Sequence, residues 1–199
     1  MFANRCTALI DANVLASAPK RDLILTLARA GMCRFRWTRR IMEETESALV
    51  SMFLARGFEN AASQSRAAAS TAAMVGAFPE AMIDGDFSNT PVYDGIPDPK
   101  DHHILHAAIR CQAPMLVTDN IRDFPSYVLK PHANEIATAE DIIVDTIDLD
   151  SVRAAKAVKG LRMRLDNPPL DAKALLALWD TRHGLSGTVS LLRPHQDLI

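Results

Sequence analysis

Acidic residues stand at the ends of two apolar runs, where they could hold a metal ion. Asp11 directly follows the run Cys6–Ile10. Asp119 directly follows a second run, Met115–Thr118, and Asp123 comes four residues later. If both runs are strands of one parallel sheet, these acids share the sheet end at which open α/β folds bind their ligands. An acid at a strand end is also common as a turn or helix cap, and this alternative stays open for each.

One glutamate of a cluster of three is set apart by helical phase. Thr38 can cap a helix that runs to about Arg56. At 3.6 residues per turn, this helix buries one stripe of side chains, namely Ile41, Thr45, Ala48, Leu49 and Met52. Glu44 lies at the edge of that stripe, whereas Glu43 and Glu46 turn toward solvent. Glu44 is therefore the member of the cluster that can face a crevice beside the core.

Asp101 occupies an unusual place in a later helix. Asp98-Pro99 predicts the start of a helix, with Asp as the cap and Pro at the first position, and the helix runs to about Gln112. Asp101 falls in the middle of its apolar stripe, which consists of Ile104, Leu105, Ala108 and Ile109. A bare carboxylate there costs several kcal/mol unless it is paired or metal-bound. Asp101 could instead cap the helix, but Asp98 is already available for that task.

Several carboxylates without a basic partner in their motifs indicate Mg²⁺ or Mn²⁺, which prefer hard oxygen ligands and retain water. Such an ion can bind a phosphate oxygen and activate a water molecule for in-line attack. The competing metal is zinc, because His102 and His106 are four residues apart, as helical ligands often are. We expect these two residues and His103 on or near the polar side of the helix, and no third ligand follows in sequence.

The net charge of −2 conceals an uneven distribution. Between Glu80 and Asp150 there are 14 acidic and 4 basic residues, whereas both flanking regions are basic. This pattern fits either ordinary solvated faces or an acidic metal centre bordered by surfaces for an anionic polymer. Four arginines precede and open the helix of Glu44, and they form either a solvated edge or a phosphate clamp: Arg34, Arg36, Arg39 and Arg40.

Strands and helices alternate along most of the 199 residues, which predicts an α/β fold with a central parallel sheet flanked by helices. Besides the elements named above, we expect further strands at Cys33–Trp37 and Glu135–Thr138, and helices at Lys20–Ala30, Glu59–Gly76 and from Ala139, with a loop at Phe78–Pro97. The last fifty residues predict two helices, at about 150–165 and 171–183, joined by Asn167-Pro168-Pro169. We therefore expect one main domain, 1–147, and a small helical extension, 148–199.

Four motifs occur in an order that resembles the PIN-domain ribonucleases, of the kind found as VapC-type toxins of type II toxin–antitoxin pairs. They are Asp11-x-Asn13-Val14-Leu15 after a strand, Thr38 to Glu44 opening a helix, Asp98-Pro-x-Asp101 with Leu105 and Ala108, and Val117 to Pro125. The resemblance covers roughly residues 6–145. The tail, with Asp148-Leu149-Asp150 and Asn167 to Leu170, resembles the helical C-terminal extension of one PIN subgroup.

The resemblance implies a Rossmann-like sheet and a set of four acids that holds one or two Mg²⁺ or Mn²⁺ ions. The first three acids are Asp11, Glu44 and Asp101, and Asn13 and Thr118 match positions that brace the set. The family often has an acid where this chain has Asn120, so the fourth acid is either Asp123 or Asp119. We favour Asp123, because a short helical turn from Asn120 would direct it back toward the strand end. The expected metal ligands are Asp11, Glu44, Asp101 and Asp123.

The function that this implies is an endonuclease that hydrolyses RNA with a metal-activated water and is silenced by a cognate antitoxin protein. One alternative is a dehalogenase-like phosphatase, but that class has a second Asp where this chain has Asn13. The other is a catalytically silent PIN-like module that binds RNA or protein. The Ala-rich segment Ala61–Ala73 is either core or a surface for a partner or a homodimer.

Composition indicates where in the cell the protein is expected. The longest internal stretch without a charged residue, Ala67 to Pro79, has 13 residues, whereas a membrane span needs roughly 18 or more apolar residues. The first residues lack the long apolar run of a secretory signal. Three cysteines without metal spacing fit buried thiols in a cytoplasmic protein. Aromatic residues are 6% of the chain, which is sparse for a surface that stacks several bases.

Overall fold

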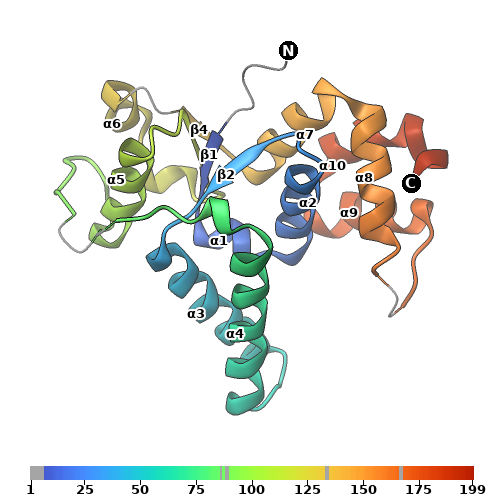
Figure 1. The fold of residues 1–199 in the computed structure, drawn as a ribbon, viewed down its shortest axis with the longest axis horizontal. Helices are drawn as coiled ribbons and strands as arrows, with labels where there is room; N and C mark the ends of the chain where they lie inside the picture. Colours follow the sequence, from blue (N-terminus) through green and yellow to red (C-terminus); the bar gives the residue numbers. More distant parts are fainter. Residues whose placement is uncertain (1–6, 86, 88–89, 133–134, 166–167) are drawn as a thin grey trace. The chain divides into compact units, whose positions relative to one another are not determined.

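The structure is a computed structural model that describes residues 7–85, 87, 90–132, 135–165 and 168–199 (Figure 1). Cys6, predicted to begin the first strand, and Asn167, from the predicted linker, lie outside these residues. Contacts divide the chain into two units. The sheet unit comprises residues 7–16 and 34–137, and the helical unit comprises residues 17–33 and 138–199.

The sheet unit is built on four parallel strands in the order β2-β1-β3-β4. Their bounds are Thr7–Ile10, Arg34–Arg36, Met115–Val117 and Glu135–Ala137 for β1 to β4. The central strands β1 and β3 consist of apolar residues that are almost all buried, which is typical of parallel strands covered on both faces. Because β1 pairs with β3 in parallel, the segments that follow Ile10 and Val117 emerge at the same end of the sheet.

Three helices of the sheet unit follow the first two strands. Helix α1, Ala12–Ala16, begins immediately after Asp11 and contacts α3, Arg39–Ala55. The Thr38 side chain caps α3 by accepting a hydrogen bond from the Ile41 N–H, as the sequence predicts. Helix α4, Asn60–Ala77, returns alongside α3 as a helical hairpin (Figure 1).

The segment before α5 anchors the helix that carries Asp101. A 3₁₀ turn, Pro99–Asp101, leads into α5, His102–Arg110, and Asp98 caps the turn by accepting from the Lys100 N–H. Gly95 has a φ of +96°, and a Cβ there would lie 2.5 Å from the Tyr127 hydroxyl oxygen, so glycine is required. Tyr127 belongs to the short helix α6, Ser126–Leu129, which follows a further 3₁₀ turn, Ile121–Asp123.

The helical unit contains five helices among its described residues, and short-range capping defines most of their starts. Their bounds are α2 Ala18–Arg29, α7 Ala139–Leu149, α8 Ser151–Arg162, α9 Ala172–His183 and α10 Ser186–Leu192. Thr138 and Asp141 form a capping box at α7, and Asp150 and Asp171 cap α8 and α9. Helix α10 packs closely on α7, since a Cβ at Gly187 would lie 2.9 Å from Val144 Cγ2.

The predicted α/β class with a parallel sheet, flanking helices and C-terminal helices is confirmed. Three α-helices were not predicted, α1, α6 and α10, and neither was the terminal 3₁₀ segment Arg193–Leu198. The domain boundary after residue 147 stays a prediction, and the contact-defined units group residues 17–33 with 138–199. In the described part of the chain, no helix is both long enough and apolar enough to cross a membrane.

Candidate active site

Asp11 is held in one orientation at the end of β1. Its side chain is buried, and Oδ1 accepts a hydrogen bond of 2.6 Å from the Ala12 N–H. Oδ2 accepts from Asn13 Nδ2 at 2.8 Å and from Thr118 Oγ1 at 2.7 Å. Burial raises the pKa of Asp11, although the hydrogen bonds from Thr118 and Ala12 oppose the shift. The nearby negative charge of Glu44 raises this pKa further.

Asn13 and Thr118 connect the ends of the two central strands. Asn13 Nδ2 also donates to Thr118 Oγ1 at 2.8 Å, and Asn13 Oδ1 accepts from the Asp119 N–H at 3.2 Å. Thr118 is fully buried, and its hydroxyl oxygen accepts from the Asn120 N–H at 3.1 Å. The side chains of Asn13 and Thr118 thus hold the Asp11 carboxylate in place, and they also bind the backbone N–H groups of the two residues that follow Thr118.

Asp101 lies among other acids. Burial raises its pKa to about 6, and the negative charges of Asp11, Asp123 and Asp98 add to the shift. These charges act on Asp101 from the end of β1, from the turn after β3 and from the cap of its own 3₁₀ turn. Burial and repulsion from neighbouring acids therefore both favour the protonated form of Asp101.

Asp123 and Asp119 differ in their relation to Asp101. The turn Ile121–Asp123 begins after Asn120, and the Asp123 N–H donates to the Asn120 carbonyl at 3.0 Å. The ring of Phe124 is buried directly after this turn. Asp123 lies close enough to Asp101 to raise its pKa, whereas Asp119 is exposed and is not among the causes of that shift. Their roles stay a prediction, and the geometry groups Asp123 with the other acids.

Glu44 approaches this group from α3. Its Oε1 lies 3.2 Å from Arg40 Nε and 3.0 Å from His103 Nε2. Burial works to raise the pKa of Glu44, but His103 and Arg40 outweigh it and leave this pKa below its usual value. We call Asp11, Glu44, Asp101 and Asp123 the acid centre, because charge interactions link Asp11 to Glu44, and link Asp101 to both Asp11 and Asp123.

The expectation that the three histidines of α5 lie on or near its polar side is wrong for two of them. His102 and His103 are both buried, with His103 only 1% exposed. Both lie inside α5, so the buried face of this helix is wider than the predicted apolar stripe, and the Tyr93 segment covers part of it through its contact with His102. Sequence reasoning missed His103, although it stands four residues before the buried Ala107.

His102 and His106 both contact Tyr93, a residue of the segment before Asp98. His102 Nδ1 accepts from the Tyr93 N–H at 2.8 Å, and His106 Nδ1 lies 2.9 Å from the Tyr93 hydroxyl oxygen. The Nδ1 atom of neutral His102 therefore carries no proton, which puts the proton on Nε2. This pair anchors the loop before Asp98 to α5, so the structure gives it a task other than zinc binding.

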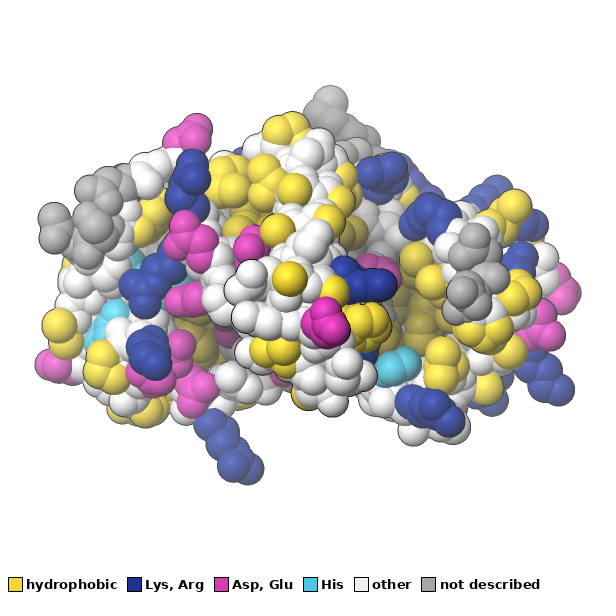
Figure 2. All heavy atoms as spheres, turned by 90° about the horizontal axis from the view of Figure 1, so that it is seen from below, with side chains coloured by type: hydrophobic (Ala, Val, Ile, Leu, Met, Phe, Trp, Pro, Cys, Tyr) yellow, Lys and Arg dark blue, Asp and Glu magenta, His cyan; other side chains and the backbone are white. Residues whose placement is uncertain are grey.

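The four arginines predicted near the acids divide into two pairs. Arg36 donates to the Glu80 carbonyl, and Arg40 is shared between Glu44 and the Lys100 carbonyl at 3.3 Å. Arg34 and Arg39 are exposed. On the face in Figure 2, basic and acidic side chains and a histidine lie next to one another at the left, where α5 lies in Figure 1. Cations thus border acids on this surface.

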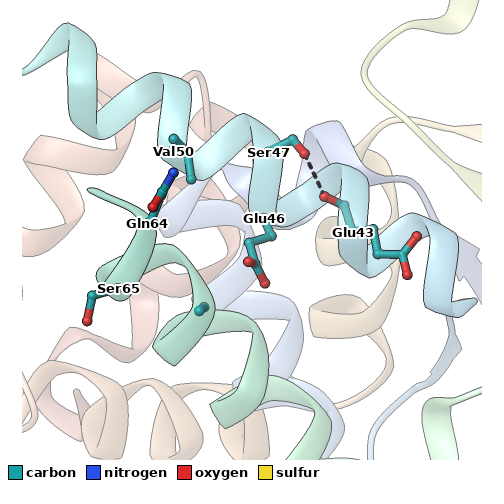
Figure 3. A pocket seen from close by; sticks show the side chains of 7 residues that line it. Glu43, Glu46, Ser47, Val50, Gln64 and Ser65 are labelled. Carbon is teal, nitrogen blue, oxygen red and sulfur yellow. Dashed lines mark hydrogen bonds between the residues drawn. The ribbon is translucent and has the colours of Figure 1, made fainter. Parts of the chain in front are cut away.

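A surface hollow lies between α3 and α4, and the three glutamates of α3 differ in whether they line it (Figure 3). Glu43 and Glu46 line this hollow, whereas Glu44 is not among its lining residues. Glu46 also accepts a hydrogen bond of 2.9 Å from Thr71 Oγ1 of α4. Glu44 is thus separated from its neighbours as the helical phase predicts, but Glu46 contacts α4 instead of turning to solvent, so that part of the prediction is wrong.

The acid centre fits a hard divalent cation by its charge and its oxygen donors. The raised pKa values of Asp11 and Asp101 record burial and mutual repulsion that a bound cation would relieve. Among the described residues, no group of three or more His, Cys, Asp or Glu side chains is gathered closely enough to hold a metal ion. The donor chemistry is thus suitable, while the side chains do not form a coordination sphere.

Comparisons with known proteins agree with this arrangement. The sequence model of the PIN domain family matches residues 7–122, and that of the "VapC50 C-terminal domain" matches residues 139–194. A relative from Mycobacterium tuberculosis, named "Putative ribonuclease VapC50", is 32% identical over 77 residues. This alignment covers 39% of the chain and 46% of that relative, which is less than half of each. No solved structure matches the chain.

Proposed function

The chain belongs to the PIN domain family, and from this premise we propose that it is an endoribonuclease that uses Mg²⁺ or Mn²⁺ and serves as the toxin of a type II toxin–antitoxin pair. The observation that carries the proposal is the acid centre, in which Asp11, Asp101 and Asp123 interact by charge. The similarity to a protein named as a ribonuclease supports the same reaction. The two matched family models cover residues 7–122, which include three of the four strands, and residues 139–194 of the C-terminal helices.

Each residue of the acid centre has a proposed task. Asp11, Glu44, Asp101 and Asp123 would hold the cation, which when bound supplies Lewis-acid activation of a water molecule and of the scissile phosphate. Thr118 and Asn13 keep the Asp11 carboxylate fixed through hydrogen bonds of 2.7 and 2.8 Å. Asn120, which stands at the position of a frequent family acid, donates its N–H to Thr118 and so supports the same brace.

The RNA backbone would be bound by cations at the border of the acid centre. Arg34 and Arg39 are exposed and suited to phosphate contacts, which position a nucleic acid without reading its sequence. Arg36 and Arg40 also hold backbone carbonyls within the protein. These contacts hold the guanidinium of Arg40 in place, and its remaining N–H donors could still reach a phosphate.

A nuclease toxin requires a protein that silences it, and we propose a cognate antitoxin that inserts an arginine among the acids. A guanidinium pairs strongly with carboxylates, and it would relieve the same repulsion that a metal ion relieves. With an RNA substrate and such a partner, the location that we propose is the cytoplasm. Coexpression with the product of the adjacent gene should give a complex without nuclease activity. If neither a complex nor silencing appears, the toxin assignment fails while the nuclease assignment stands.

The test of the nuclease is cleavage of total RNA by the purified chain with Mn²⁺, with Mg²⁺ and with a chelator. We expect metal-dependent cleavage that Asp11→Asn abolishes. Asp180→Asn is the matched control, because Asp180 makes an exposed ion pair with Arg193 at 3.5 Å and should leave cleavage unchanged. Activity that persists in the chelator would exclude the metal mechanism. RNA binding without cleavage under every condition would favour a catalytically silent module instead.

A further inference from the structure

His103 is a buried polar side chain at the acid centre. It is 1% exposed, and its Nε2 lies 3.0 Å from Glu44 Oε1. Within the described part of the chain, neither of its ring nitrogens makes a well-aligned hydrogen bond. Burial of a polar group without an aligned partner costs free energy, so this position needs a reason.

The surroundings of His103 supply a reason, since its ring lies near three acids. When protonated, the ring works to lower the pKa of Asp11, of Glu44 and of Asp101, whereas Arg40 is a cause of the shift for Glu44 only. His106 provides the contrast, because it stands one turn later on α5 and contacts Tyr93. The two histidines therefore face different parts of the sheet unit.

Glu44 is contacted from two directions. Arg40, on the same helix, approaches from the solvent side, and the side chains of this pair are 43% and 37% exposed. His103 approaches from the buried side. Both contacts use Oε1, so neither requires the second oxygen of Glu44. The balance between the two contacts decides whether the carboxylate lies with the other acids or extends along Arg40.

We infer that His103 is a positioning residue of the acid centre, which holds Glu44 Oε1 on the buried side so that this carboxylate stays with Asp11 and Asp101. The inference rests on the proposed function, in which Glu44 helps to hold the cation. Two neighbouring elements then contribute to the site: the 3₁₀ turn supplies the acid Asp101, and α5, two residues later, supplies the side chain that places the acid of α3. A histidine that merely filled the core would be replaceable by an apolar side chain of similar size.

The first measurement uses the metal-free protein and needs no activity. Urea unfolding midpoints are compared for His103→Leu, Glu44→Gln and the double variant. If His103 holds Glu44, the two substitutions act on one contact, and their combined effect is smaller than the sum of the separate effects. Additive effects would overturn the inference.

The second measurement is Mn²⁺ affinity by calorimetry. Loss of a group that orients a ligand costs about 10–100-fold in metal affinity, and we expect this loss for His103→Leu. His103→Gln, which keeps an N–H near the Nε2 position, should restore most of the affinity, and His106→Leu should leave it unchanged. A leucine variant that binds Mn²⁺ as the wild type does would overturn the inference, as would a wild type that binds no Mn²⁺.

Substitution of a buried residue can prevent folding, and a second pair of variants covers this case. His103→Asn places its amide near the Nδ1 position, and His103→Gln near the Nε2 position, so only the glutamine variant should retain Mn²⁺ affinity. Equal affinities in the two would contradict a contact through Nε2. In RNA cleavage, we expect kcat to fall in His103→Leu with KM unchanged. A wild type that binds Mn²⁺ but cuts no RNA defeats the proposed function, while the affinities still decide the inference.

Discussion

Acidic side chains in the helical unit and in the acid centre have opposite surroundings. Asp150 and Asp171 accept N–H groups at the starts of α8 and α9, at 3.0 and 2.7 Å. Glu140 accepts from both the N–H and the hydroxyl of Thr188, at 2.9 and 2.7 Å. The pKa of Asp101, in contrast, is raised by burial and then by the negative charges of three further aspartates.

This difference separates structural acids from candidate functional acids. A carboxylate that caps a helix start stabilises it by about 1 kcal/mol, so its presence there needs no further explanation. Acids that raise one another's pKa destabilise the protein that contains them, unless a cation compensates for the charge. The acid centre therefore has a cost in stability that a bound cation would offset.

The largest expected effect separates the two kinds of acid directly. Asp101→Asn should lower RNA cleavage by about 1,000-fold, because metal-assisted stabilisation of the transition state contributes several kcal/mol. It should also make the metal-free protein more stable, since a repelled charge is removed. Asp171→Ala should do the reverse, with unchanged cleavage and a loss of about 1 kcal/mol from the missing cap. RNA cleavage rates and urea unfolding midpoints are measured for both variants. If Asp171→Ala lost more cleavage activity than Asp101→Asn, the division into structural and functional acids would be wrong.

Metal binding should stabilise the wild-type protein through the acid centre. At a free Mn²⁺ concentration of 100 times the Kd, linkage adds about 2.7 kcal/mol to the free energy of unfolding. Thermal unfolding with and without Mn²⁺ should therefore show a higher Tm with the ion. Asp11→Asn should reduce that increase, and Asp180→Asn should retain it. An equal increase in the Asp11 variant would place the ion elsewhere.

Asp123 and Asp119, the two candidates for the fourth acid, can be compared within the sheet unit. Asp123→Asn should reduce Mn²⁺ affinity and RNA cleavage about 10–100-fold, because Asp123 interacts with Asp101. Asp119→Asn should have little effect, as Asp119 is exposed and its N–H, which the substitution retains, bonds Asn13. Both variants are compared at equal fold stability. Loss of activity in the Asp119 variant alone would exchange the two roles.

The smallest effect is the pH dependence of stability. The pKa of Asp101 is raised from 3.8 to about 6 in the folded protein, so folding favours the protonated form. Its ionisation therefore destabilises the protein progressively as pH rises from about 4 to about 6. After allowance for solvent screening, the cost is about 1 kcal/mol above that range. Urea unfolding of wild type and Asp101→Asn should diverge over this interval in metal-free buffer, and parallel curves would refute the raised pKa.

Much of the sheet unit could be predicted because its signals are local. The buried runs before Asp11 and Asp119 identify the central strands, and Thr38 and Asp98 cap the elements that they precede. The phase of α3 then separates Glu44 from Glu43 and Glu46. In each case a few adjacent residues contain the information.

The parts that were missed depend on contacts that are distant in sequence. Helix α10 has seven residues and no side-chain cap, and its Thr188 pairs with Glu140, 48 positions earlier. His103 was placed on the polar side because the buried face of α5 is wider than its aliphatic stripe, and contacts from Glu44 and Tyr93, which are distant in sequence, cover the remainder. The proximity of Asp123 to Asp101 depends on how the turn after β3 is oriented, which no local pattern encodes.

The single amide of Asn13 has a consequence for how the chain can change in length. It bonds Asp11, Thr118 and the Asp119 N–H, and so joins the ends of β1 and β3 across 105 positions of sequence. A one-residue insertion inside β3 would turn Thr118 to the opposite face of the sheet and break this link. Insertions in the hairpin of α3 and α4 would leave it intact. Length variation among related chains should therefore accumulate in that hairpin and avoid the two central strands.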